Sequence, residues 1–409
     1  MSLLISEAEH LHKLLATLII VAAVFTARSQ TEADQKSRLD SLRAQGYQSL
    51  YNLDYESARR SFREMISLAP EHPAGPQCMA ASFWVEQLNE SWELKATLYS
   101  TKTYSQENKL QDPKRKEEFR NWIRSSRQLS QARLKRDPHD VEALYFLGAA
   151  EGLEAAFSAA VERRFMASLR SGSDAVEHHR EVLKQNPELR DAELTIGLHN
   201  YIVGSLPLPL KLVVGSFGVR GSKKRGLKTL EEVSREGHWA RDVALVLLVD
   251  LYKREKRWQD AVNVSRSLAS RYERNYLFKL QLADALANSE LQNRNVVEIA
   301  DIFERLLKDK TLESSVVELI HFRYGETLLV LGDPNQALNQ FQWLLSHRST
   351  EHTMKSMSQL RLAQCFDMVG KRTEALATYR SLLASPSEPD FKNEVKRGIQ
   401  QPYHWVKSQ

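Results

Sequence analysis

The stretch Tyr324-Gly-Glu-Thr-Leu-Leu-Val-Leu-Gly-Asp-Pro-Asn-Gln-Ala-Leu-Asn-Gln-Phe-Gln-Trp-Leu344 decides the fold of this 409-residue chain. Its two apolar halves are separated by Gly332-Asp-Pro334, and proline and glycine favour a turn over a continuous helix. Gly325 in the first half is small enough to let a second helix approach closely. Phe341 in the second half is large enough to fill the space between the two helices. The stretch therefore predicts a packed hairpin of two helices.

The same positions recur every 38 residues on both sides of this stretch, with agreement in residue size as well as in hydropathy. Three rows show the repeat: Leu268, Leu306, Leu344 and Leu382; Ala261, Ile299, Ala337 and Ala375; Leu248, Leu286, Tyr324 and Leu362. A single hairpin cannot bury its own apolar side and must stack on its neighbours. We therefore predict an all-α, right-handed superhelical solenoid of antiparallel helix pairs. Four regular repeats are expected over residues 242–389, and a cap containing Tyr403 and Trp405 over residues 390–409.

The amino-terminal half predicts helices of less regular length. One further hairpin is expected over residues 39–73, where Gly46 and Phe62 have the spacing of Gly325 and Phe341. The rest of residues 30–200 predicts long helices, including two that are joined near Pro113 and one that runs over residues 141–169. Asp174 is predicted to cap a further helix that ends at Asn186-Pro187.

Small, aromatic and proline residues at these intervals resemble the tetratricopeptide repeat (TPR) family, over residues 39–73 and 242–389. The consensus tryptophan of that family and some of its tyrosines are replaced here. The chain resembles exported bacterial TPR proteins of unassigned function. Residues 190–262 also have a looser likeness to eukaryotic TPR proteins linked to inclusion-body clearance. The resemblance implies a binding surface and carries no catalytic residue.

The resemblance places a partner-binding surface on the first helix of each hairpin, on the concave side of the superhelix. The residues at those positions are Arg43, Tyr47, Leu194, Leu198, Asp250, Glu326, Arg361 and Gln364. The lysine and asparagine pairs with which chaperone-binding members hold a carboxyl terminus are not at these places. We therefore expect a protein-protein interaction or scaffolding module that binds a partner protein or peptide without catalysis.

Charge and motifs argue against nucleic-acid binding and against an active site. The net charge is +5 with both signs interspersed, which is typical of a solvated helical surface. His178 and His179 lie in the densest histidine cluster, but neighbouring side chains on a helix point about 100° apart and do not share one metal ion easily. We expect this cluster to be a solvated face, with no metal and no cofactor. A metal-dependent hydrolase subunit remains the alternative from the enzyme class.

The amino terminus predicts export. Leu14 to Ala27 is an apolar or small-residue stretch preceded by Lys13 and followed by an Ala-Arg-Ser sequence, as in a signal peptide. The stretch is shorter than the about 20 residues of a membrane-spanning helix. Residues 1–29 are therefore expected to be a signal whose removal leaves Gln30 first, in a periplasmic or secreted protein. An uncleaved anchor and a buried start are the alternatives.

Residues 201–241 predict an insertion that is first apolar and then glycine-rich and basic. We expect its apolar part to pack inside the superhelix. The alternatives are contact with an anionic bilayer, as in a peripheral membrane adaptor, and a dimer interface. The apolar residues concerned are Leu206, Leu208, Leu210, Leu212 and Phe217.

Overall fold

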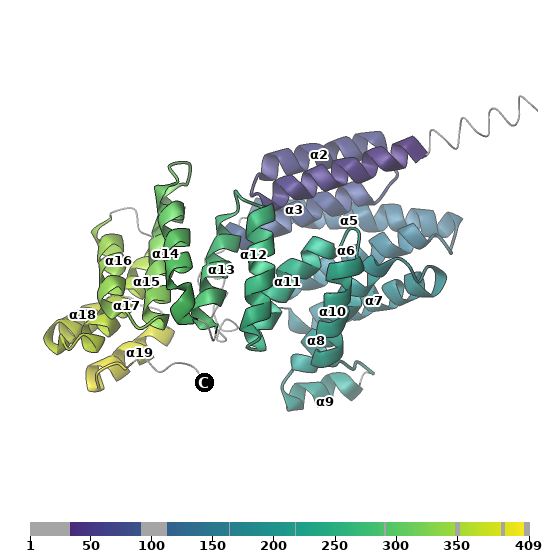
Figure 1. Cartoon of the computed structure of the whole chain (residues 1–409). Helices are drawn as coiled ribbons and strands as arrows, with labels where there is room; N and C mark the ends of the chain where they lie inside the picture. The colour runs from purple at the N-terminus through teal and green to yellow at the C-terminus, as the bar shows by residue number, and fades with distance from the viewer. Residues whose placement is uncertain are drawn as a thin grey trace, which may run out of the picture. The chain divides into compact units, whose positions relative to one another are not determined.

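The computed structural model describes residues 33–90, 113–162, 164–216, 218–289, 292–347, 352–385 and 389–404, and these are mainly α-helical with no β-strand among them (Figure 1). The predicted all-α class of stacked helix pairs is confirmed. The right-handedness of the superhelix stays a prediction. The expected signal at residues 1–29, Phe217 and Trp405 lie outside the described residues.

The chain divides into two units, at Ser222. Unit 1 begins with a helix over residues 33–51 and continues with α2 (Tyr55–Leu68), α3 (Ala74–Glu90), α5 (Pro113–Arg136), α6 (Val141–Ala160), α7 (Phe165–Gln185), the short 3-10 helix η1 (Arg190–Ala192), α8 (Glu193–Ser205) and α9 (Leu208–Ser216). Consecutive helices pack on one another through most of this unit.

Unit 2 begins with a single helix, α10 (Lys223–Glu236), which packs on α11. Four hairpins follow: α11 (Arg241–Arg254) with α12 (Trp258–Arg271), α13 (Tyr276–Asn288) with α14 (Gln292–Lys308), α15 (Ser314–Val330) with α16 (Pro334–Ser346), and α17 (His352–Met368) with α18 (Arg372–Ala384). The last helix is α19 (Pro389–Gln400), which packs on α18.

The three rows of repeated positions form the core of unit 2, as predicted. All twelve side chains are buried except that of Tyr324, which is half-buried and stacks on Phe303 with 4.4 Å between ring centroids. A Cβ atom added to Gly325 would lie 2.6 Å from the ring of Phe341, closer than real Cβ contacts allow. The glycine is therefore required where the ring of the second helix meets the first helix.

The same contact between a ring and a glycine occurs at two other places. In unit 1, Phe62 of α2 fills the space over Gly46, as the sequence predicts. In unit 2, Tyr379 of α18 packs against Gly398 of α19, so the last helix continues the stack. Val395 and Ile399 of α19 pack on the same cluster around Tyr379.

Two hairpins of the fold have an aspartate that caps their second helix. The Asp54 carboxylate accepts a hydrogen bond from the backbone N–H of Ser57 at the start of α2. Asp333 does the same for Gln336 at the start of α16, with Pro334 in the first turn. The preceding Gly332 has φ of 81°, which glycine adopts without strain. These two hairpin turns are thus fixed by local sequence.

One prediction in unit 1 is wrong, because residues 141–169 form two helices instead of one. α6 ends at Ala160 and α7 begins at Phe165. The turn between them lets the buried Glu162 carboxylate pair with Lys116 of α5 at 3.1 Å and with Arg120 of the same helix. As a consequence Asp174 lies inside α7 and does not cap it. The predicted end of that helix before Asn186-Pro187 is confirmed.

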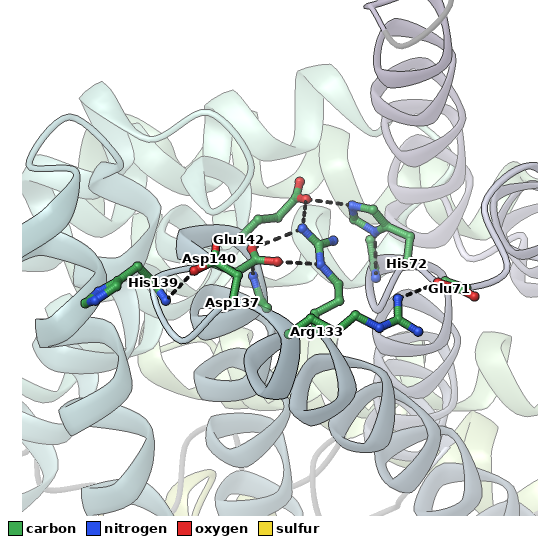
Figure 2. A network of polar contacts seen from close by, with 10 residues as sticks. Glu71, His72, Arg133, Asp137, His139, Asp140 and Glu142 are labelled. Atoms are coloured by element: carbon green, nitrogen blue, oxygen red, sulfur yellow. Dashed lines mark hydrogen bonds and ion pairs between the residues drawn. The ribbon is translucent and has the colours of Figure 1, made fainter.

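Three parts of unit 1 meet in the polar network of Figure 2. His72, in the loop after α2, contacts Glu142 of α6 with 3.0 Å between Nε2 and Oε2. Arg133, near the end of α5, pairs with the same Glu142 oxygen at 3.0 Å and with Asp140 at 2.7 Å. Asp140 also caps α6 by accepting from the backbone N–H of Ala143. These contacts fix the start of α6 against α5 and the preceding loop.

The network changes the ionisation of Glu142. Burial alone would raise the pKa of this carboxyl, but the contacts with His72 and Arg133 outweigh burial and lower the pKa to about 2. A carboxyl whose pKa is lower in the folded state stabilises that state above its unfolded pKa of about 4.3. This stabilisation is lost as the pH falls from there towards 2.

We therefore predict that Glu142→Gln lowers the free energy of unfolding at pH 7 by about 1 kcal/mol, a value reduced for partial solvent exposure. The difference between wild type and variant should shrink as the pH falls below about 4.5. Urea unfolding across this pH range measures it, and Glu71→Gln, in an exposed ion pair with Arg136, is the matched control. A difference that stays constant with pH would contradict this assignment.

Candidate interaction surface

The first helices of unit 2 carry a row of polar side chains, and some of these bridge one hairpin to the next. The helices concerned are α11, α13, α15 and α17, and neighbouring members of this series are in contact from α13 to α17. We call this set of side chains the first-helix face; it consists of Asp250, Lys253, Gln281, Asp284, Arg323, Glu326, Arg361 and Gln364.

The 38-residue period explains why several of these residues share one face. Asp250, Glu326 and Gln364 occupy one repeat position, and Arg323 and Arg361 occupy another. Equivalent positions of stacked hairpins lie side by side, so a polar residue at such a position meets a polar residue of the next repeat. The face is thus a product of the same repeat that builds the core.

Between α15 and α17, a carboxylate lies between two guanidinium groups. Glu326 pairs with Arg323 at 2.7 Å and with Arg361 of the next first helix at 3.1 Å. Arg361 also donates a hydrogen bond of 2.9 Å to the amide oxygen of Gln364. The structure therefore brings together three of the predicted partner-binding residues, Glu326, Arg361 and Gln364. Gln364 is buried, so the accessible part of this group is formed by the half-buried Glu326 and Arg361.

Between α11 and α13, the face carries acceptors. Lys253 pairs with Asp284 across the two helices at 3.2 Å. The pKa of the nearby Asp250 is raised, mainly by burial and further by the charge of Asp284, although Lys253 acts in the opposite direction. The Oδ1 atom of Asp250 and the Oε1 atom of Gln281 are buried and accept no hydrogen bond from the described residues. Two buried acceptors on neighbouring first helices therefore lack a donor from the described residues.

At the far end of the face, the chain after α19 returns to α17. The fully buried Asp367 carboxylate accepts hydrogen bonds from Arg372 at 2.8 Å, from the Tyr379 hydroxyl at 3.2 Å and from the backbone N–H of Tyr403 at 2.8 Å. Burial raises the pKa of the Tyr403 phenol, and the nearby Arg361 acts in the opposite direction. Tyr403 thus lies next to Arg361 and borders the face.

The predicted residues of unit 1 have a different role. Arg43 is buried, and its guanidinium carbon lies 5.7 Å from the ring centroid of Tyr47 and 5.8 Å from that of Phe146. Burial raises the pKa of the adjoining Cys78 thiol, and burial also raises the pKa of Tyr145 to about 12. These groups form a packed polar core. The expectation that Arg43 lines an open surface is therefore wrong, whereas Leu194 and Leu198 on α8 are half-buried.

The histidine cluster is not the solvated face expected from the sequence. His179 is buried, its Nε2 atom lies 3.0 Å from the carbonyl oxygen of Tyr145, and its pKa is lowered to about 4, mainly by burial. Gly148 of α6 makes room for its ring, since an added Cβ would lie 2.6 Å from it. His178 pairs instead with Glu151 at 2.8 Å. In the described part of the chain, no three His, Cys, Asp or Glu side chains are grouped to hold a metal ion.

The apolar middle segment is more exposed than the sequence suggested. Leu208, Leu210 and Leu212 of α9 are exposed and Leu206 is half-buried, so internal packing is wrong for most of this segment. None of the helices in the described residues has the length and apolar character needed to span a bilayer.

Cys78 and Cys365 are both buried and free.

Four residues of the first-helix face were not identified from the sequence. Arg323 precedes Arg361 by 38 residues, so the repeat itself contained the signal for it. Lys253, Gln281 and Asp284 have no such signal. Lys253 and Asp284 come from different repeat positions, and only the structure shows that the two side chains meet.

Comparison with known proteins gives a likeness at the level of solved structures only. No family model matches the sequence, and no curated protein matches it. A thermophilic TPR protein from Thermus thermophilus aligns at 18% identity and a TM-score of 0.34, covering 48% of this chain and 98% of that one. Human IFIT1, solved as a dimer with m7Gppp-AAAA, aligns at 13% identity and 0.43, covering 88% and 84%. Yeast Tom70 aligns at 8% identity and 0.37, covering 86% of each chain.

Proposed function

We propose that this protein is a non-catalytic interaction or scaffolding module that binds a partner protein or peptide along the first-helix face of unit 2. The observation that carries the proposal is the pair of buried acceptors on neighbouring first helices, Asp250 and Gln281, which receive no donor from the described residues. Burying an unpaired acceptor costs roughly 1–3 kcal/mol, so a retained pair favours a role outside folding.

The charges of the face define the partner that it suits. Asp250 and Gln281 hold unpaired acceptors beneath the face, which donors of a partner reach once the covering side chains move, and the half-buried Arg361 offers donors at the other end of the same row. The face therefore has acceptors at one end and donors at the other. It would match a peptide or protein segment that has backbone N–H groups or basic side chains at one end and an acceptor at the other. The mixture of signs does not favour the phosphate backbone of a nucleic acid.

We further propose that the protein works outside the cytoplasm, in the periplasm or as a secreted protein. This rests on the apolar stretch over residues 14–27 and on the Ala-Arg-Ser sequence that ends it.

Substitution of an unpaired acceptor should separate binding from folding. Gln281→Met keeps the side-chain length but removes the acceptor, so we expect the free energy of unfolding to stay equal or to rise by about 1 kcal/mol. The same change should weaken binding of a partner captured from the periplasmic or secreted fraction, once that partner has been identified, by about tenfold. Calorimetric titration of the purified pair measures the loss.

Gln342→Met is the matched control, because Gln342 is an exposed glutamine on the second helix α16. It should leave the affinity unchanged. Arg361→Gln provides a second probe at the other end of the face and should also weaken binding. An affinity that survives both Gln281→Met and Arg361→Gln in folded protein would show that the partner binds elsewhere.

The location is tested by the amino terminus of the natural protein. We expect mass spectrometry of the protein isolated from the periplasmic or secreted fraction to find Gln30 as its first residue. Recovery from the cytoplasmic fraction with residues 1–29 intact would contradict export.

A further inference from the structure

The nine-residue helix α9 displays large apolar side chains to solvent. Leu208 and Leu212 are 70% and 68% exposed, and Leu210 and Val213 are also exposed. Ile202 of the preceding helix α8 adds one more exposed apolar side chain. In Figure 1, α9 lies below α8 at the lower end of the picture. This is the densest group of exposed large hydrophobic residues in the described part of the chain.

The helix is nevertheless held in a defined place. Val214 is the buried residue through which α9 is anchored. The chain then turns at Gly218, where φ is 79°, and the N–H of Val219 donates to the carbonyl of Val214. Gly221 follows and lies so close to α8 that an added Cβ would be 2.6 Å from Val203. The carboxyl-terminal end of α9 is therefore fixed while its large apolar side chains remain outside the core.

The apolar side chains do not form the single stripe that fits a groove in a partner protein. With about 100° between successive residues, Leu208 and Leu212 lie on one side of the helix and Leu210 and Val213 on another. A protruding helix with apolar side chains on more than one side does not fit a rigid groove. It suits a fluid surface that can rearrange around it. The outer region of a lipid bilayer is such a surface.

The surrounding charge selects the kind of lipid. No acidic residue occurs between Glu193 and Glu231 in the sequence. Lys211 in α9 and Arg220 just after it are exposed, and neither forms an ion pair with the described residues. A second copy of the chain would bring like charges together at this place. Anionic headgroups instead complement the lysine and arginine while Leu208 and Leu212, which share one side of α9, enter the acyl region.

We infer that α9 is an interfacial membrane-binding element that docks the protein on a bilayer containing anionic lipid. Nine helical residues span about 14 Å, less than half of the about 30 Å hydrocarbon core, so the helix lies in the interface and does not cross. This contact is separate from the first-helix face. A scaffold with both would hold its partner at a membrane surface.

The test is co-flotation of the full chain with phosphatidylcholine vesicles and with vesicles that also contain phosphatidylserine. Wild-type protein should bind the anionic vesicles about tenfold better than the neutral ones, and the preference should fall with added salt. The double substitution Leu208→Asp and Leu212→Asp should reduce binding to anionic vesicles by about tenfold or more. Because both side chains are mostly exposed, circular dichroism should show the variant folded.

Two further variants decide between explanations. Lys211→Glu with Arg220→Glu should remove the preference for anionic vesicles. Val296→Asp with Val297→Asp introduces the same charges at exposed apolar positions of α14 and should leave binding unchanged. Equal binding by wild type and the leucine variant would overturn the inference and leave residues 14–27 as the source of any membrane affinity. If the leucine variant turns a dimer into a monomer without changing vesicle binding, α9 serves self-association. That result would also overturn the inference.

Discussion

At three places in the helix stack, an aromatic ring from one helix occupies the place where the other helix has no side chain. Phe62 over Gly46 and Phe341 over Gly325 show this contact within hairpins, and Tyr379 against Gly398 shows it between one hairpin and the next helix. A methyl group at these glycines would collide with the ring, so ring and glycine require each other. The contact fixes how closely two helices approach and hence which residues of the next pair they meet.

The repeat also has consequences for the polar side of the first helices. Because equivalent positions are stacked, charges at those positions either pair with the next repeat or remain unpaired on the surface. Glu326 is paired on both sides, by Arg323 and by Arg361, and contributes to the stacking of α15 on α17. Such half-buried pairs add little net stability, since the cost of desolvation offsets their attraction. We interpret the row mainly as a surface for recognition.

The regular part of the fold was predictable because it depends on residue size at a constant spacing. The twelve core positions and the contacts of Gly46 and Gly325 follow from the sequence alone. Features that depend on long-range pairing were not predictable. Glu162 pairs with α5 from the turn that follows α6, and His179 is buried where Gly148 of another helix makes room for it. The exposure of Leu208 and Leu212 also needed the structure, since hydropathy cannot distinguish an unpartnered helix from a packed one.

A double-mutant cycle at Gly325 and Phe341 tests most directly whether the ring and the glycine require each other. Gly325→Ala should destabilise the protein by about 1–3 kcal/mol because the added methyl group meets the ring. Phe341→Leu removes the ring and should lower the cost of that methyl group. In urea unfolding, the double variant should be more stable than the sum of the single effects by at least about 1 kcal/mol. Effects that add within about 0.5 kcal/mol would contradict it.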